Sequence, residues 1–178
     1  MIPERYKTAT YAHIPKEIQS AVETMKDHRK GLYIFGAVGT GKTHIAYALK
    51  DYYDKEKKGA IIWGTTELLR EMRQDINREP EEKKRVDQIL MDTPMPVILD
   101  DVGAEKMSDW VLETFYLIIN KRYNDMLPII CTSNFSIGDL ASRIGDRTAS
   151  RLVEMCLLFE LDGKDKRTLD AKSVKIKT

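Results

Sequence analysis

One short stretch restricts the possible folds of this chain more than any other feature. Residues 36–43 read Gly-Ala-Val-Gly-Thr-Gly-Lys-Thr, which matches the G-x-x-x-x-G-K-[ST] pattern of a phosphate-binding loop, or Walker A motif. The stretch follows an apolar run at 31–35 and precedes a segment with apolar residues at helical spacing. In that setting, backbone N–H groups and the helix N-terminus would surround a phosphate group. We therefore predict a nucleotide site between a strand and a helix.

The side chains at the end of this loop have separate expected roles. The Lys42 ammonium would reach the β- and γ-phosphates, and the Thr43 hydroxyl would bind Mg²⁺. The alternative is a glycine-rich turn with an exposed lysine, but the complete motif in the right context disfavours it. The residues that we expect to bind the nucleotide are Gly36, Ala37, Val38, Gly39, Thr40, Gly41, Lys42, Thr43 and His44.

Beyond the loop, short apolar runs alternate with longer segments at helical spacing, which is typical of a parallel α/β sheet. We predict a five-stranded, mostly parallel sheet with helices on both faces. The expected strands are residues 31–35, 60–63, 96–101, 127–132 and 157–161. The expected helices are residues 42–57, a helix that Thr65 or Thr66 caps, a helix that Ser108 caps, and residues 146–155. The third strand is apolar throughout, so we expect it inside the sheet, covered on both faces.

Composition agrees with a single domain of this kind. The chain has 178 residues, of which 42% are hydrophobic, so it can bury a core without disulfide bonds. It has no apolar run long enough to span a membrane, and we expect no signal peptide. Cys131 and Cys156 lie in apolar runs, which indicates buried free thiols in a reducing compartment. We therefore expect a cytoplasmic protein without membrane contacts, whose net charge of +1 leaves nucleic-acid binding to a local patch.

Polar side chains follow the third and fourth predicted strands. Asp100 and Asp101 come at the carboxyl end of the third strand, which is the edge where open α/β sheets bind their ligands. Asp100 fits the Walker B role of holding Mg²⁺ through its water shell, and Asp101 would polarise the attacking water. Asn134, after the fourth strand, could orient that water. A solvated acid pair and ordinary turn chemistry around Asn134 are the alternatives, but the phosphate loop favours a site.

Three arginines near the end of the chain form a further candidate group. Arg143, Arg147 and Arg151 are spaced four apart, and the last two share one face of a predicted helix. One of them could reach across a subunit boundary as an arginine finger and stabilise charge on the transferring phosphoryl group. Alternatively, they form a surface stripe that pairs with Asp146 and Glu154.

In this order, the phosphate loop, the acidic strand end, the strand-end asparagine and the arginine-bearing helix resemble an AAA+ ATPase. Shorter stretches are similar to the bacterial replicative helicase loaders of the DnaC/DnaI family. They are Ile-Pro-Glu-Arg-Tyr at 2–6, Gly-Thr-Gly-Lys-Thr-His at 39–44, Leu-Asp-Asp-Val-Gly at 99–103, Ser-Asp-Trp at 108–110, Asn-Lys-Arg-Tyr-Asn at 120–124 and Thr-Ser-Asn at 132–134. The resemblance covers roughly residues 1–168.

The resemblance implies an ATPase with an AAA+ core, whose cofactors are ATP and Mg²⁺. The catalytic residues that it implies are Asp101, Asn134 (sensor 1), Arg151 (arginine finger) and Arg167 (sensor 2). Family members assemble as helical oligomers on single-stranded DNA and deliver the replicative DNA helicase. Many AAA+ proteins have Glu where this chain has Asp101, whose side chain is one methylene shorter, so we expect slow, assembly-dependent hydrolysis.

The same resemblance sets the expected domain boundaries. We expect an ATPase core over residues 1–161, with a helical insert at 77–95 that contains Pro80 in its first helical turn. A basic tail over 162–178 is too short for a full helical lid. Because the chain begins where the family's ATPase domain begins, we expect the N-terminal region that docks the helicase to be absent.

The insert is the candidate DNA-binding region. In this family an extra helix after the second strand lines the DNA channel, so Lys83, Lys84 and Arg85 could contact DNA phosphates. Their glutamate neighbours could instead neutralise these cations. Two other functions also stay open: an IstB-like transposition helper that acts on duplex DNA, and a nucleotide-gated scaffold with little hydrolysis.

Overall fold

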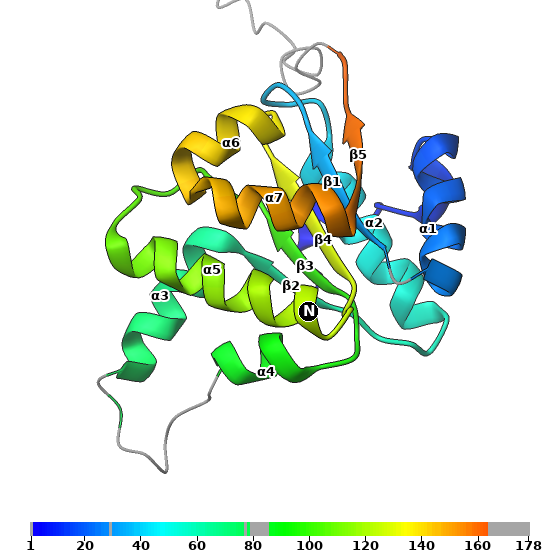
Figure 1. Ribbon diagram of the computed structural model, residues 1–178. Coiled ribbons are helices and arrows are strands. Elements are labelled where there is room, and N and C mark those ends of the chain that lie inside the picture. The colour runs from blue at the N-terminus through cyan, green and yellow to red at the C-terminus, as the bar shows by residue number, and fades with distance from the viewer. Residues whose placement is uncertain (1, 29, 77, 79–85, 164–178) are drawn as a thin grey trace, which may run out of the picture.

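The apolar runs form one five-stranded sheet in which every strand pairing is parallel (Figure 1). This computed structural model describes residues 2–28, 30–76, 78 and 86–163. The strands are β1 (Gly31–Phe35), β2 (Ile61–Gly64), β3 (Val97–Asp100), β4 (Ile129–Ser133) and β5 (Cys156–Glu160). Their order across the sheet is β2-β3-β4-β1-β5, so the predicted five-stranded sheet is confirmed.

Burial follows the position of each strand in the sheet. Every residue of β4 is buried, and β1 and β3 are buried except at their last residue, because helices cover both faces of these interior strands. The two edge strands, β2 and β5, are partly exposed. The apolar third strand lies inside the sheet as predicted, between β2 and β4.

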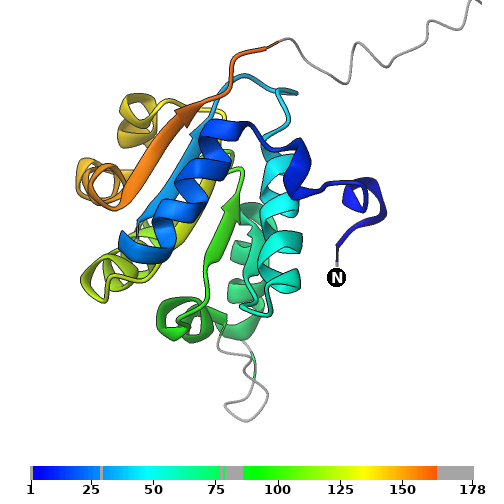
Figure 2. The same ribbon diagram turned by 90° about the vertical axis from the view of Figure 1, so that its right-hand side faces the viewer.

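Helices cover both faces of the sheet, as predicted. One face carries α3 (Thr65–Ile76), α4 (Val86–Asp92), α5 (Asp109–Asn124), α6 (Ile137–Ile144) and α7 (Asp146–Met155). The other face carries α1 (Lys16–His28), α2 (Lys42–Lys55) and the short 3-10 helices η1 (Glu4–Tyr6) and η2 (Tyr11–His13). Figure 2 shows the two helical layers with the sheet between them.

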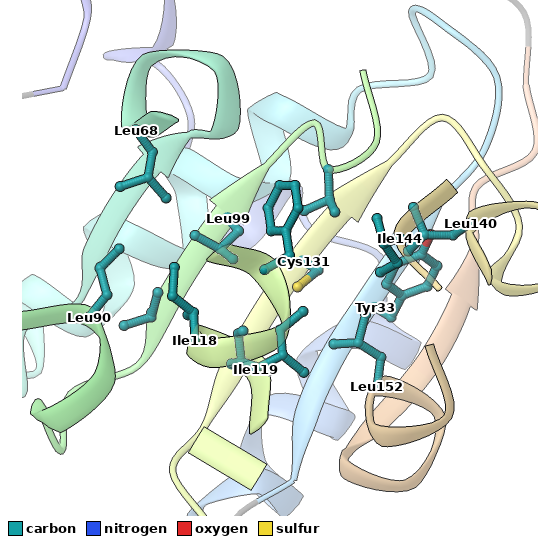
Figure 3. Packing of buried hydrophobic residues seen from close by; sticks show 14 of the residues in the cluster. Tyr33, Leu68, Leu90, Leu99, Ile118, Ile119, Cys131, Leu140, Ile144 and Leu152 are labelled. Atoms are coloured by element: carbon teal, nitrogen blue, oxygen red, sulfur yellow. The ribbon is translucent and has the colours of Figure 1, made fainter. Parts of the chain in front are cut away.

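A hydrophobic core lies on each side of the sheet. On the α5 side, Ile118 and Ile119 belong to one cluster with Leu99 of β3 and Cys131 of β4 (Figure 3). Each fully buried aliphatic side chain in such a core stabilises the fold by about 1.5–3 kcal/mol. Both cysteines are free and buried, as predicted, and burial raises the pKa of the Cys131 thiol to about 12.

The helices α1 and α6 are two elements that the sequence patterns above leave unassigned. In α1, Ile18, Val22 and Met25 are buried at spacings of four and three, so a helical signal was present in the sequence. The helix α6 has only eight residues, and its start is fixed by the Ser136 side chain, which accepts a hydrogen bond from the backbone N–H of Asp139. A helix of about two turns has too few apolar positions to show the helical period of 3.6 residues in the sequence.

The insert predicted at 77–95 is helical over α4 in its described part. Val86 and Leu90 of α4 are buried, so this helix belongs to the core on the α5 side. The predicted helix start at Pro80, the predicted DNA contacts Lys83, Lys84 and Arg85, and the predicted sensor 2 residue Arg167 all lie outside the described residues. Within the described ranges, no helix is long and apolar enough to cross a membrane.

Candidate functional site

The phosphate-binding loop connects β1 to α2, as the motif predicts. A Cβ atom at Gly36 would lie 2.4 Å from the carbonyl oxygen of Leu161, so only glycine fits there. Gly41 has a φ of 104° and caps α2 without a side-chain hydrogen bond. Because the first N–H groups of a helix lack partners inside the helix, this uncapped end can bind an anion.

Lys42 lies inside this loop rather than in solvent. Its side chain is only 7% exposed, and its Nζ donates hydrogen bonds to the carbonyl oxygens of Gly36 (2.8 Å) and Ala37 (2.7 Å). A buried ammonium needs such partners, since desolvation of a charge is costly. The loop therefore encloses the positively charged ammonium group of Lys42.

Asp100, at the end of β3, lies next to the phosphate loop. The hydroxyl of Thr132 donates a 2.5 Å hydrogen bond to its Oδ1, and Thr43 of the phosphate loop lies near enough to the carboxyl group to lower its pKa. Burial raises the pKa of Asp100, while the two hydroxyls and the charge of Lys42 act in the opposite direction. The structure thus brings together the two residues that the sequence predicts for Mg²⁺, Thr43 and Asp100.

Asp101 adopts a left-handed backbone conformation, with a φ of 65°. Non-glycine residues rarely adopt positive φ, although Asp and Asn do so more readily than others. Its Oδ1 accepts a 2.7 Å hydrogen bond from Nδ2 of Asn134, and its backbone N–H donates to the Thr132 hydroxyl (2.9 Å). The predicted catalytic pair, Asp101 and Asn134, is therefore in direct contact.

Residues that the sequence did not single out link these strand ends. The Thr65 hydroxyl, at the start of α3, lies 3.2 Å from the carbonyl oxygen of Asp100 and 2.9 Å from that of Asp101. Ser133 donates to the carbonyl oxygen of Val102 (2.7 Å). For Thr132 and Ser133 a signal existed, because both directly precede the candidate Asn134 at the end of β4. For Thr65 the sequence indicated only a helix cap.

A pocket of about 720 Å³ opens at this edge of the sheet. Its volume falls within the range of about 300–1,000 Å³ that is usual for small-molecule sites. From the predicted nucleotide-binding set, the lining residues are Val38, Gly39, Thr40, Gly41, Lys42, Thr43 and His44. Asp101, Thr132 and Asn134 complete the wall on the β3–β4 side. Gly36, Ala37 and Asp100 do not line it, although each contacts a residue that does.

The N-terminal segment forms a further part of the pocket wall, which the sequence analysis did not anticipate. Arg5, Tyr6, His13 and Pro15 line the pocket. The Tyr6 ring stacks on Tyr47 of α2 with 4.6 Å between centroids, and a second tyrosine pair 4.2 Å apart joins η2 to α2. Stacked aromatic rings fix this segment against the helix that begins at the phosphate loop.

The donor atoms at the site suit Mg²⁺. Among the residues that the structure describes, no group of three or more His, Cys, Asp or Glu side chains is placed to hold a metal ion. The Thr43 hydroxyl and the Asp100 carboxyl group are hard oxygen donors that lie near each other. Mg²⁺ is usually held by one or two such protein groups together with water and substrate phosphates. The residues present therefore fit a nucleotide-bound Mg²⁺ better than a metal held by protein alone.

Arg143 is held by contacts within its own chain. Its Nε donates to the carbonyl oxygen of Gly103 (2.8 Å) and its Nη2 to that of Glu105 (3.1 Å). Its guanidinium also lies over the Phe135 ring, 4.6 Å from the centroid. These contacts tie α6 to the loop that follows β3, so Arg143 is not placed as a projecting arginine.

Arg151 and Arg147 lie on α7, and neither lines the pocket of this chain. The Arg151 guanidinium lies over Tyr116 and Tyr123 of α5, at 5.2 and 5.6 Å from the ring centroids. Its Nη1 donates to the carbonyl oxygen of Arg147 (2.9 Å), whose own side chain is exposed. Within the described residues, neither arginine forms the alternative ion pair: Glu154 instead accepts a hydrogen bond from Tyr123 (2.7 Å).

Known protein sequences match most of this chain. A family model described as IstB-like ATP binding protein matches residues 8–173. The replicative helicase loader DnaI of Bacillus subtilis (strain 168) is 30% identical over 93% of this chain and 56% of its own length. This chain spans about half the length of the curated relatives that it matches.

Solved structures share the fold. A crystal structure of the DnaC helicase loader has a TM-score of 0.77 and 28% sequence identity, covering 90% of this chain and 100% of that chain. The replication initiator DnaA, solved with AMPPCP and single-stranded DNA, has a TM-score of 0.70 at 23% identity, covering 85% of this chain and 46% of that chain. The arrangement of strands and helices is therefore that of the AAA+ domains predicted from the motifs.

Proposed function

The chain belongs to the family of IstB-like ATP binding proteins, and from this we propose that it binds and hydrolyses ATP with Mg²⁺ in the manner of a helicase loader. One observation supports this most directly. Asn134 beyond β4 donates a hydrogen bond to Asp101 at the acidic end of β3, and both residues line one pocket together with the phosphate loop. Three separate parts of the sequence thus converge on a single pocket.

In this proposal, the loop amides and Lys42 bind the phosphates. The Lys42 ammonium exchanges its contacts with the carbonyl oxygens of Gly36 and Ala37 for contacts with phosphate oxygens. Thr43 and Asp100 would hold Mg²⁺, Asp100 through water, and the ion would supply positive charge at the β- and γ-phosphates.

Hydrolysis needs a group that positions water at the γ-phosphate. Asn134 donates to Oδ1 of Asp101, which fixes the orientation of the carboxylate in the pocket wall. We propose that the other oxygen, Oδ2, accepts a hydrogen bond from the attacking water and polarises it. Because the Asp side chain is short, we expect the rate to be low.

Assembly is a further part of the proposal. Arg151 lies outside the pocket of its own chain, which is compatible with a role at the pocket of a neighbouring subunit in a helical oligomer. Arg151→Ala should then leave ATP binding intact and reduce hydrolysis only under conditions of assembly. The same effect from Arg147→Ala would instead make Arg147 the arginine finger. The sensor 2 role of Arg167 remains a prediction from the resemblance.

The proposed partners are single-stranded DNA and a replicative DNA helicase. The support comes from DnaI, matched over most of this chain, and from the DnaC structure, covered completely. Lys83, Lys84 and Arg85 are the proposed DNA contacts. The description of the family model favours one alternative, an IstB-like helper of transposition that acts on duplex DNA.

Fluorescence anisotropy of labelled single-stranded and duplex DNA tests these proposals. The protein is titrated into each labelled DNA in the presence of ADP, in the presence of a non-hydrolysable ATP analogue, and without nucleotide. The Lys42→Ala variant is titrated in the same way. Tighter, cooperative binding to the single strand with the analogue, lost in Lys42→Ala, is expected for a helicase loader. Preference for the duplex would favour the transposition helper. DNA binding in no state, together with ATP binding but negligible hydrolysis, would indicate a nucleotide-gated scaffold.

A further inference from the structure

Two buried threonines lie on either side of the acidic strand end. Thr65 follows β2 and Thr132 belongs to β4, so they approach Asp100 and Asp101 from the two strands that flank β3. Each threonine is 1% exposed. They resemble each other in chemistry and burial, but they contact different atoms of the aspartates.

Thr132 contacts a carboxylate oxygen and a backbone N–H group. Its hydroxyl donates to Oδ1 of Asp100 at 2.5 Å and accepts from the backbone N–H of Asp101 at 2.9 Å. A hydroxyl has one proton to donate and lone pairs to accept with, and here both capacities are used. The single proton goes to the Asp100 carboxylate because the second partner, an N–H group, can only donate.

Thr65 contacts only the main chain. Its hydroxyl oxygen lies 3.2 and 2.9 Å from the carbonyl oxygens of Asp100 and Asp101. It therefore supports the turn after β3 without touching either carboxylate. This makes Thr65 a natural control for Thr132, because the loss of either hydroxyl removes a buried contact to the same two residues.

We propose that Thr132 is a positioning residue of the nucleotide site, whose hydroxyl orients the Asp100 carboxylate toward Thr43 and holds the left-handed turn at Asp101. The inference rests on the proposed function, since it concerns the same pocket. Thr132 itself lines that pocket, and the β3–β4 register supports the role. Leu99 pairs with Cys131, so the next residues along the two strands are Asp100 and Thr132. The contact is thus a direct consequence of strand pairing.

The experiment follows a fluorescent ATP analogue bound to the full chain while Mg²⁺ is titrated. Thr132→Val keeps the shape of the side chain but cannot donate or accept a hydrogen bond. It should need roughly 10- to 100-fold more Mg²⁺ than the unchanged protein for the half-maximal signal change, as expected when a group that orients a metal ligand is lost. Thr132→Ser retains the hydroxyl and should restore the Mg²⁺ midpoint to within about threefold, well below the loss expected for Val.

Two further variants separate positioning from general destabilisation. Thr65→Val should lower the melting temperature but leave the Mg²⁺ midpoint unchanged. Thr132→Ala removes the hydroxyl without placing a methyl group against Asp100, so it provides the same test if Thr132→Val fails to fold. All titrations are made well below the lowest melting temperature measured.

The outcomes distinguish this inference from the function on which it rests. If the unchanged protein binds the analogue no better than Lys42→Ala does, the proposed function fails and the inference fails with it. If the unchanged protein binds with a clear Mg²⁺ dependence, three results overturn the inference alone. These are an unchanged midpoint in both Thr132→Val and Thr132→Ala, an equal rise in Thr65→Val, and a Thr132→Ser variant as impaired as Thr132→Val.

Discussion

Among the described residues, two buried basic side chains are held by backbone carbonyl groups, but they lie at opposite edges of the sheet. Lys42 is 7% exposed and lies in the phosphate loop, after the carboxyl end of β1. Arg122 of α5 is 0% exposed and lies at the other edge, where β3 and β4 begin. The carbonyl groups that accept from its two terminal nitrogens are those of Leu90 (2.6 Å), Thr93 (3.2 Å), Met95 (2.9 Å) and Pro128 (2.7 Å).

The difference between the two sites is access. Lys42 lines an open pocket, so its carbonyl partners can be exchanged for the oxygens of a ligand. Arg122 is fully enclosed, and burial lowers the pKa of its guanidinium to about 10. Its carbonyl partners belong to α4 and to the segments that precede β3 and β4, which it joins. The same chemistry, a cation on backbone carbonyl groups, thus leaves the cation accessible to a ligand where the site is open and joins segments of the chain where it is closed.

The largest effect is expected from removing the enclosed cation. Arg122→Met keeps the apolar stem of the side chain but removes the donors from four carbonyl groups, of which that of Pro128 keeps the backbone N–H of Val97 (3.3 Å). This change should lower the free energy of unfolding by about 3–5 kcal/mol. Urea denaturation measures this loss, and nucleotide affinity should stay unchanged in the folded protein. Lys121→Met, at the exposed neighbouring position, should change the free energy by less than ~1 kcal/mol. A loss of similar size in both variants would contradict the structural role of the Arg122 hydrogen bonds.

Removal of the accessible cation should give the reverse pattern. Lys42→Ala should weaken ATP binding by at least about 100-fold, or ~2.7 kcal/mol, because no other side chain supplies a positive charge inside the loop. The free energy of unfolding should change little, since Gly36 is only partly buried and Ala37 is exposed, so water can hydrogen-bond to their carbonyl groups in place of the ammonium. Calorimetric titration with ATP measures the affinity. Lys55→Ala, whose side chain on the same helix is 69% exposed, is the control, and retained affinity in Lys42→Ala would refute the role of the phosphate loop.

A conservative exchange tests why the enclosed site uses arginine. Arg122→Lys retains the charge, but one ammonium group cannot reach four carbonyl groups that the two guanidinium nitrogens bind together. The free energy of unfolding should fall by about 1–3 kcal/mol, less than in Arg122→Met. Urea denaturation of both variants, measured in parallel, shows which of them has the lower free energy of unfolding. A lysine variant as unstable as the methionine variant would mean that the retained charge contributes nothing.

The smallest expected effect is the coupling between the two sites. They share no partner and lie at opposite ends of strands that rise about 3.3 Å per residue. The unfolding free-energy changes of Lys42→Ala and Arg122→Lys should therefore add to within about 0.5 kcal/mol in the double variant. A coupling above about 1 kcal/mol would show that the two edges of the sheet are energetically linked.

The two cations also differ in how far the sequence could predict them. Lys42 belongs to a motif whose residues are contiguous, so its position and its chemistry could be read together. Arg122 falls at helical spacing among the apolar residues of α5, which indicates that it faces the core. Its partners at Leu90 and Met95, however, lie 32 and 27 residues away. No local pattern reveals contacts made over such a separation.

In the candidate site, too, some features could be predicted from local sequence patterns and others could not. The positions of Asp100, Asp101 and Asn134 followed from apolar strands that end in polar residues, and these residues do meet. The hydroxyl contacts of Thr65 and Thr132 could not be predicted, because they depend on which strands are neighbours. The order β2-β3-β4-β1-β5 is a tertiary property that no single strand encodes.

The backbone conformation at Asp101 has a consequence for how this sequence can change. A positive φ is best tolerated by Gly, Asn and Asp, whose short side chains permit a left-handed turn. A glutamate at position 101 would reach one methylene farther into the pocket, but it would meet a backbone suited to a shorter residue. Because Thr65 and Thr132 maintain that turn, substitutions at these three positions should be epistatic. A lineage that acquired Glu at 101 would need compensating changes at the two threonines. Few orders of substitution at these three positions would therefore keep the protein functional.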